Sequence, residues 1–122
     1  MSLVLWALQV VLGVFFVGTG VIHFVVPDGL PSMMAWMYDL DPTLHYVSGT
    51  AEILGALGLI LPGLTRIQAW LTPLAAVGLI AVMVLAAVFH LGRDEIPNVG
   101  LNVVLAGLLA VVAYGRWRVS PL

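Results

Sequence analysis

Cysteine and lysine are absent from this 122-residue sequence, and charged residues of either sign are scarce. Without thiols there is no disulfide framework, Cys-x-x-Cys redox site or thiolate metal site, so we expect no intrinsic haem or iron–sulfur centre. The four basic residues are all arginines and form no patch that would hold nucleic acid. Charged residues make up 8% of the chain, whereas a soluble domain carries about a quarter. The chain is therefore not an ordinary soluble domain.

Long apolar runs dominate the sequence instead. Hydrophobic residues make up 62% of it, and its mean hydropathy is +1.16. About 20 helical residues cross the core of a bilayer. Four runs reach or approach that length, namely residues 3–26, 44–61, 68–91 and 98–115. Turn signals such as Pro62-Gly63 separate the runs, and Pro73 is expected to introduce no more than a kink. The sequence predicts one all-α domain over residues 1–122, an integral membrane bundle of four transmembrane helices.

Arginine placement predicts the orientation of these helices. Arg66 lies in the second connection, and Arg116 and Arg118 follow the fourth run. Arg93 alone lies in the third connection. Because arginines gather on the cytoplasmic side of membrane proteins, both termini are predicted to be inside, with the bilayer a bacterial-type inner (cytoplasmic) membrane.

The first connection, residues 27–43, has a composition of its own. Three methionines, a tryptophan and a tyrosine stand within residues 33–38. This mixture fits a short amphipathic turn in the membrane interface, where Trp and Tyr side chains prefer headgroup depth. The same segment is also suited to fold over the outer mouth of the bundle as a lid.

Several polar residues fall inside the apolar runs, mostly in the predicted outer half. Glu52 lies deep, roughly 12 Å below the interface at a rise of about 1.5 Å per residue. A charge at a helix centre costs about 2.5–3.5 kcal/mol on insertion scales, so such residues face protein or a wet cavity. We predict an outer polar pocket that binds a ligand or handles protons. Its candidate residues are Glu52, His23, His90, Asn102, Ser48 and His45.

Some of these polar residues also have plainer interpretations. His45 would reach the interface along its own side chain, and Asn98 would cap the fourth helix. His23 and Asn102 would join helices by hydrogen bonds worth about 0.6 kcal/mol each. Glu52 lies too deep to reach the interface along its own side chain. No His-x-x-x-His or Glu-x-x-His pair places two ligands on one helix, so no metal site is predicted.

Small residues recur at helical spacing in the second run, at Ala51, Gly55 and Gly58. Stripes of this kind let membrane helices approach closely, so bundle packing is their predicted role. Alternatively, a glycine near Glu52 would leave room for a ligand ring.

Three stretches of the sequence carry a family resemblance. They are Gly20-Val-Ile-His-Phe-Val-Val-Pro27, Ser48-Gly-Thr-Ala-Glu-Ile-Leu-Gly-Ala-Leu-Gly-Leu-Ile-Leu-Pro62, and Thr65-Arg66 followed by Ala69-Trp70. In these motifs the chain resembles the DoxX-like family, and Gly-x-x-Glu-x-x-Gly is their most specific part. Many members carry Gly-x-x-Lys-Leu where this chain has Gly20-x-x-His23-Phe24. The chain therefore resembles a branch with the histidine–phenylalanine version.

The resemblance implies a four-helix integral membrane protein. The family takes its name from a subunit of a thiosulfate:quinone oxidoreductase, and relatives are described as oxidoreductase-associated membrane proteins. Glu52 and His23 are the positions that match recognisable motif residues. The resemblance carries over no established chemistry for either of them.

Three functions compete at this point. The first is an accessory membrane subunit of a redox system that binds a quinone or another lipophilic ligand, with Glu52 and a histidine accepting protons. The second is a non-enzymatic binding or assembly protein, as a homo-oligomer or with a partner membrane subunit. The third is a small transporter or proton pathway. It has less support because no inverted repeat is visible and the predicted inner half lacks a polar exit.

Overall fold

The computed structural model describes all 122 residues and consists of helices and their connections. The long helices are α1 (Ser2–Val25), α2 (Pro42–Thr65), α3 (Leu71–Gly92) and α4 (Ile96–Tyr114). A 3-10 helix, η1 (Ser32–Tyr38), lies in the first connection, and a π-helical turn, η2 (Gly115–Val119), continues α4. Four helices are long and apolar enough to cross a membrane. The predicted all-α bundle of four membrane-length helices is confirmed.

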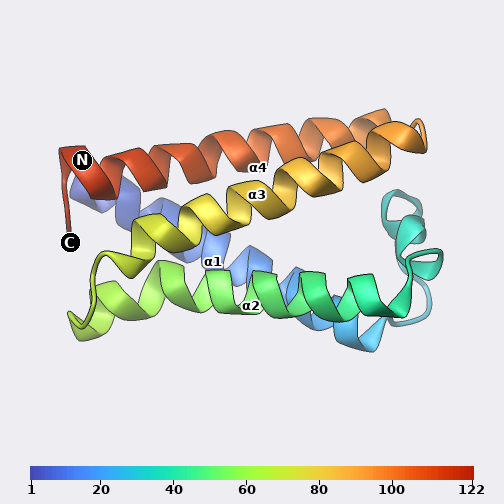
Figure 1. Cartoon of the computed structure of the whole chain (residues 1–122), viewed down its shortest axis with the longest axis horizontal. Coiled ribbons are helices and arrows are strands. Elements are labelled where there is room, and N and C mark those ends of the chain that lie inside the picture. The colour runs from blue at the N-terminus through green and yellow to red at the C-terminus, as the bar shows by residue number, and fades with distance from the viewer.

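The four helices run up and down, so that both termini lie at one end of the bundle and η1 lies at the other (Figure 1). We call these the terminal end and the lid end, and we call η1 the lid. α1 packs along α2, and α3 packs along α4. The two hairpins meet chiefly through α2 and α3, whereas α1 and α4 touch much less.

The bounds of α2 differ from the predicted run of residues 44–61. The sequence predicts a turn at Pro62, but α2 continues through Pro62 to Thr65 and is 24 residues long. A proline inside the helix removes one hydrogen bond, which membrane helices tolerate. At its start the carboxylate of Asp41 accepts a hydrogen bond from the Thr43 N–H at 2.8 Å, and this cap begins the helix earlier than hydropathy alone indicates.

The third and fourth helices also begin at residues other than those predicted. α3 begins at Leu71 rather than at residue 68, so Pro73 lies in the first turn, where its missing N–H removes no intrahelical bond. α4 begins at Ile96 with Glu95 in the N-cap position. Asn98 therefore lies inside the first turn and does not cap the helix, contrary to the simpler interpretation of that residue.

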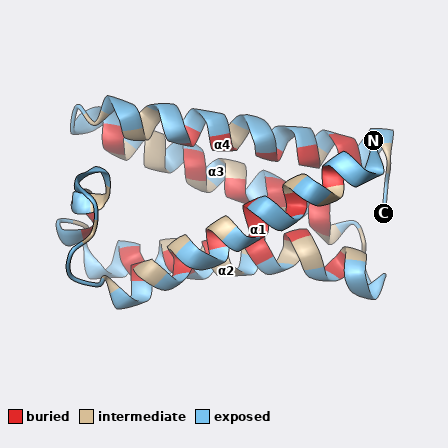
Figure 2. Cartoon of the chain, turned by 180° about the vertical axis from the view of Figure 1, so that it is seen from behind, coloured by how far each residue is buried: buried red, intermediate tan, exposed pale blue.

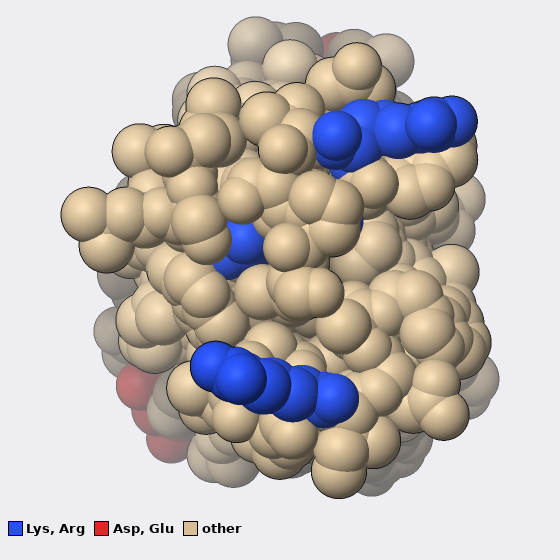
Figure 3. Space-filling view, turned by 90° about the vertical axis from the view of Figure 1, so that its left-hand side faces the viewer, with Lys and Arg blue, Asp and Glu red and all other residues tan.

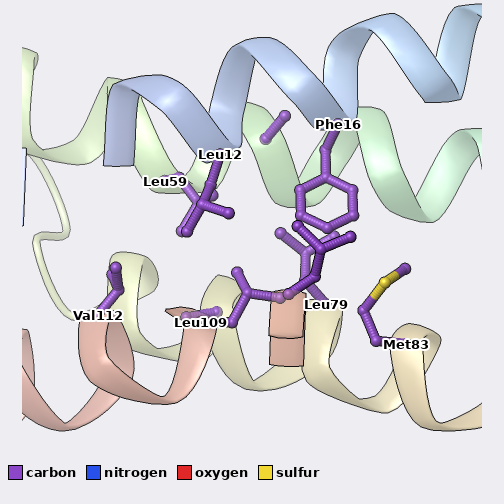
Figure 4. Packing of buried hydrophobic residues seen from close by; sticks show 10 residues of the cluster. Leu12, Phe16, Leu59, Leu79, Met83, Leu109 and Val112 are labelled. Atoms are coloured by element: carbon purple, nitrogen blue, oxygen red, sulfur yellow. The ribbon is translucent and has the colours of Figure 1, made fainter. Parts of the chain in front are cut away.

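One hydrophobic core joins all four helices (Figure 4). Its buried members are Leu12, Phe16, Ala56, Leu59, Ala76, Leu79, Met83, Leu105, Leu109 and Val112. Figure 2 shows buried residues turned toward the bundle interior and exposed ones turned outward. Many of the exposed residues are large and apolar, as a lipid-facing surface requires. Because lipid tails are as apolar as these side chains, close packing must hold such a bundle together.

Glycines permit the closest helix contacts. Gly20 of α1 faces Gly49 of α2, and a Cβ built at Gly49 would lie 2.9 Å from the Gly20 carbonyl oxygen and 3.0 Å from the Cβ of His23. Side chains of α3 fill the space beside Gly55 and Gly58 in the same way. Gly55 and Gly58 therefore pack closely against α3, as predicted. Both glycines also line a second cavity of about 350 Å³, so room for a ligand ring on this face stays a prediction.

A second buried polar cluster lies near the terminal end, whereas the sequence predicts polar residues mostly in the other half. Arg116 is 3% exposed and donates from Nε to Oε1 of Gln9 (2.6 Å) and from Nη1 to Oγ of Ser2 (3.0 Å). Gln9 in turn donates from Nε2 to the carbonyl oxygen of Leu59 at 2.6 Å. Thr72 is also buried in this half. Buried polar groups are therefore present in this half as well, in addition to those predicted for the other half.

Charge is distributed unevenly between the two ends. Arg66, Arg116 and Arg118 lie at the terminal end, because they follow α2 and α4 there. Figure 3 views this end, where basic atoms face the viewer and acidic atoms appear only at the margin. The acidic residues all belong to the lid half: Asp28, Asp39, Asp41, Glu52, Asp94 and Glu95.

Candidate functional site

A cavity of about 480 Å³ lies at the lid end of the bundle. All four long helices and the lid contribute to its wall, and most of the residues in that wall are apolar. The cavity is lined by five of the six predicted site residues: Glu52, His23, His90, Asn102 and Ser48. The sixth, His45, does not line it and instead contacts His23.

The lid lies across this cavity and supplies part of its lining. Met33, Met34 and Met37 all face the cavity, together with Trp36. The Trp36 ring packs edge-on against the His90 ring, with 4.7 Å between centroids. This placement agrees with a segment that folds over the mouth of the bundle.

Polar contacts hold the lid, and Asp39 directly after it, in place. The Tyr38 hydroxyl donates to a carbonyl oxygen in its own loop at 2.9 Å. Arg93 donates from Nη2 to Oδ2 of Asp39 at 2.9 Å. His45 donates from Nε2 to the Met37 carbonyl oxygen at 2.7 Å. Because Arg93 follows α3 and His45 lies on α2, the lid is bonded to both hairpins.

Glu52 is 4% exposed and satisfied by two partners from α1. The Thr19 hydroxyl donates to Oε1 at 2.6 Å, and His23 Nε2 lies 3.1 Å from Oε2. The other nitrogen of the His23 ring, Nδ1, faces Nδ1 of His45 at 2.9 Å. Glu52 therefore pairs with His23 and not with His90. His45 is 7% exposed and bonded at both ring nitrogens, so the interpretation that it reaches the interface is wrong.

His90 belongs to a separate network. Its Nδ1 donates to Oε1 of Glu95 at 2.9 Å, and Arg93 Nε donates to the same oxygen at 3.0 Å. The hydrogen bond from His90, followed by that from Arg93, holds the pKa of Glu95 below its usual range. Hydrogen bonds to Asp39 and then to Glu95 raise the pKa of Arg93. The other nitrogen of His90, Nε2, has no protein partner.

Asn102 is the buried residue whose side-chain amide lacks a hydrogen-bond partner. It is 8% exposed, lines the cavity, and its Nδ2 makes no hydrogen bond. It therefore does not join two helices, contrary to its simpler interpretation. A buried amide left unpaired costs about 1–3 kcal/mol. Buried polar groups without partners are uncommon in folded proteins, so this one needs an explanation.

Two of the partners in these networks were not among the predicted site residues. Thr19 precedes His23 by four residues, a spacing that places both on one helix face and therefore carries a signal in the sequence. Glu95 follows His90 by five residues across a turn, and no helical spacing indicates that contact.

A family model described as the DoxX-like family matches residues 7–112 of the chain. No curated protein matches the chain, and no solved structure does. The matched region extends from α1 into α4 and includes the residues that line the cavity.

Proposed function

The chain belongs to the DoxX-like family, and from the cavity at its lid end we propose that it is an accessory membrane subunit of a redox system. In this proposal it binds a quinone-like, lipid-soluble ligand. Its four apolar helices make it an integral, multi-pass membrane protein. The arginines at the terminal end favour an inner-membrane orientation with both termini in the cytoplasm and the lid outside (Figure 3).

The observation that carries this proposal is the unpaired amide of Asn102. Its Nδ2 is buried in a cavity wall with no acceptor from the protein. A ligand oxygen in the cavity would complete it. Ligand sites typically combine apolar walls, a volume of about 300–1,000 Å³ and a few polar groups that orient the ligand. The cavity at the lid end, about 480 Å³ in volume, has all three features.

The wall of the cavity also supports entry from the bilayer. Leu44, Val47 and Leu85 line it and are 48%, 60% and 70% exposed. The first two belong to α2 and the third to α3, so in this proposal the ligand enters from lipid between these helices. A ring with an apolar tail would place its ring inside and its tail in the bilayer.

The polar groups suit a molecule that exchanges protons. A quinone carbonyl would accept from Asn102 Nδ2, and a quinol hydroxyl would donate to the free Nε2 of His90. Glu52 and His23, already in contact, would accept a proton that a quinol releases. The electrons pass between the ligand and a partner redox subunit, so the role of this chain is to bind the ligand and handle its protons.

Quinone titration tests the proposal. Short-chain benzoquinone and naphthoquinone analogues are added to the protein in nanodiscs, and tryptophan quenching is recorded. We expect saturable quenching in the wild type and binding up to about tenfold weaker in Asn102→Leu, the value of one hydrogen bond. The matched control is Val103→Leu, because Val103 is the next residue of α4 and is 61% exposed.

Stability of the ligand-free protein gives a second readout. If Nδ2 is unpaired in the ligand-free protein and bonds to the ligand, Asn102→Leu removes an unpaired polar group. The substitution then raises the free energy of unfolding while it weakens binding. If Asn102 serves only the fold, the same substitution lowers stability and leaves binding unchanged. Absence of quenching in the wild type contradicts the proposal. Native mass spectrometry that shows a fixed homo-oligomer without ligand, indifferent to Glu52→Gln, would favour an assembly protein.

A further inference from the structure

Five groups at the lid end form one continuous line of hydrogen bonds. The Thr19 hydroxyl lies 2.6 Å from Glu52 Oε1, and Glu52 Oε2 lies 3.1 Å from His23 Nε2. His23 Nδ1 lies 2.9 Å from His45 Nδ1, and His45 Nε2 lies 2.7 Å from the Met37 carbonyl oxygen. The line therefore runs from the cavity wall, where Glu52 and His23 lie, to the lid.

These contacts determine where protons must lie. A carbonyl oxygen only accepts, so His45 carries a proton on Nε2. Two facing ring nitrogens repel each other unless one of them carries a proton, and the same is true of His23 Nε2 facing a carboxylate oxygen of Glu52. The three contacts therefore require three protons. One carboxylate and two neutral imidazoles supply only two, so the line holds one additional proton.

The additional proton has three possible positions. It lies on Glu52 as a carboxylic acid, on His23 as an imidazolium, or on His45 as an imidazolium. Moving from the first position to the second breaks the O–H bond of Glu52 and forms N–H at His23 Nε2. Moving from the second to the third breaks N–H at His23 Nδ1 and forms N–H at His45 Nδ1. All contacts persist and the three residues stay neutral in sum, as a membrane interior favours.

We propose that Glu52, His23 and His45 form a one-proton relay between the cavity and the lid, and that the shared proton latches the lid. The additional proton moves from Glu52 to His45 in these two hops, and a proton leaves His45 Nε2 to water when the lid opens. The two neutral rings then exchange tautomers, so that His23 carries its proton on Nδ1 and His45 on Nε2, and a proton donor in the cavity protonates Glu52 again. This transfer needs only a proton donor in the cavity, whatever its identity.

The latch follows from what happens when the proton is lost. With two protons, one of the three contacts must set two lone pairs against each other. The contacts among Glu52, His23 and His45 join α1 and α2, which cross closely at Gly49. The contact with Met37 joins α2 to a single short helix. The loss therefore falls on the Met37 contact, because the lid moves more easily than two packed helices.

Other ionisable groups surround the lid, and their effects must be distinguished from those of the relay. They are His90 from α3, Glu95 at the start of α4, Arg93, Asp39 at the end of the lid, and Asp41 at the start of α2. The first four are bonded to one another, and Asp41 caps α2. The Trp36 ring packs against both His90 and His23, and no hydrogen bond joins the two networks.

The absence of cysteine makes the lid easy to probe, because a single introduced thiol is unique. In the full-length protein in nanodiscs, Met34→Cys places a thiol on a half-buried face of the lid, and Ala35→Cys places one on its exposed face. Each is labelled with a water-soluble maleimide between about pH 5 and 9. Each rate is divided by the thiolate fraction measured for that variant, which removes the ionisation of the thiol itself, and the ratio of the two corrected rates reports opening of the lid.

The relay predicts how this ratio depends on pH. In the wild-type background it rises in one step with increasing pH, by about fivefold, as expected for the loss of one hydrogen bond. In Glu52→Gln the amide donates to His23 Nε2 without any additional proton, so the ratio stays flat. In the matched control Glu95→Gln, which alters only the second network, the step remains.

Several results would overturn the relay. They are a flat ratio in the wild-type background, a step that persists at the same pH in Glu52→Gln, or a step that disappears in Glu95→Gln. Nitrogen-15 NMR of labelled histidine rings in the wild type adds a test that needs no variant. Below the step it must find His45 protonated at Nε2, and a neutral ring protonated only at Nδ1 would refute the proposal. No ligand is added in either experiment, so quinone binding and the relay succeed or fail separately.

Discussion

Replacement of Gly49 by alanine tests whether the crossing of α1 and α2 positions the Glu52 contact. The new methyl carbon would lie 2.9 Å from the Gly20 carbonyl oxygen and 3.0 Å from the Cβ of His23. A carbon of the Phe24 ring, at 2.8 Å, is able to swing away, whereas the backbone carbonyl is not. Ordinary contact begins at 3.4 Å, so the two helices must separate by about half an ångström.

The magnitude follows from two opposing effects. Overpacking of this kind costs about 1–3 kcal/mol, and alanine in place of glycine inside a helix gains about 0.5–1 kcal/mol. The matched control is Gly78→Ala in α3, because a Cβ there meets no atom within 4 Å. The helix-propensity gain is shared by both variants, so the difference between them measures the crossing alone. We expect Gly49→Ala to be less stable than Gly78→Ala by about 1–3 kcal/mol.

The assay is unfolding by SDS in mixed micelles, followed by circular dichroism and converted to a free energy for each variant. A second readout is the labelling ratio of the lid thiols, because separated helices lengthen the 3.1 Å contact between His23 and Glu52. Equal free energies for the two variants would show that the helices accommodate the methyl group without cost. The claim that the crossing positions this contact would then be wrong.

Two further predictions concern the other polar networks. Gln9→Leu removes the acceptor of buried Arg116 Nε and should destabilise the protein by about 1.5–3 kcal/mol, the value of a hydrogen bond to a charged group. The matched control Val10→Leu, at the next residue of α1, which is exposed, should have little effect, and unfolding of both variants by SDS measures the difference. The fold lowers the pKa of Glu95, chiefly through the hydrogen bond from His90. Ionised Glu95 therefore stabilises the protein at pH values above 4.5, its ordinary pKa, and this stabilisation disappears as the pH falls through the lowered pKa. The stability difference between wild type and Glu95→Gln should therefore be present at neutral pH and vanish in acid, and an unchanged difference across that range would contradict the assignment.

Most of the fold could be predicted from length and hydropathy. Runs of about 20 apolar residues have few alternatives to a membrane helix, because every backbone polar group in lipid must be satisfied within the segment. Helix ends were less predictable. Pro62 is a turn signal in water, but inside a membrane bundle α2 continues past it. Asp41 is a capping residue whose importance became clear only with the helix in place.

The site could be predicted only in part, because its contacts depend on how the helices cross. The depth of Glu52 pointed to a buried polar partner, yet His23 and His90 were equally placed by sequence. The choice depends on the close crossing of α1 and α2, which brings His23 to Glu52, and on Glu95, which engages the ring of His90. A lone Gln9 in an apolar run also signals a buried partner, but that partner lies 107 residues along the chain.

The polar line from Thr19 through Glu52 to the lid has a consequence for how the protein is made. Every member of it lies between residues 19 and 52, within the first hairpin and its connection. That hairpin can enter the membrane with its carboxylate already paired, before the other half exists. The bond from Asp39 to Arg93 spans 54 residues, and at about 5–20 residues per second the ribosome needs roughly 3–11 s to supply the second partner. During synthesis the acid is thus neutralised first, and the lid is bonded to the second hairpin only after that hairpin arrives.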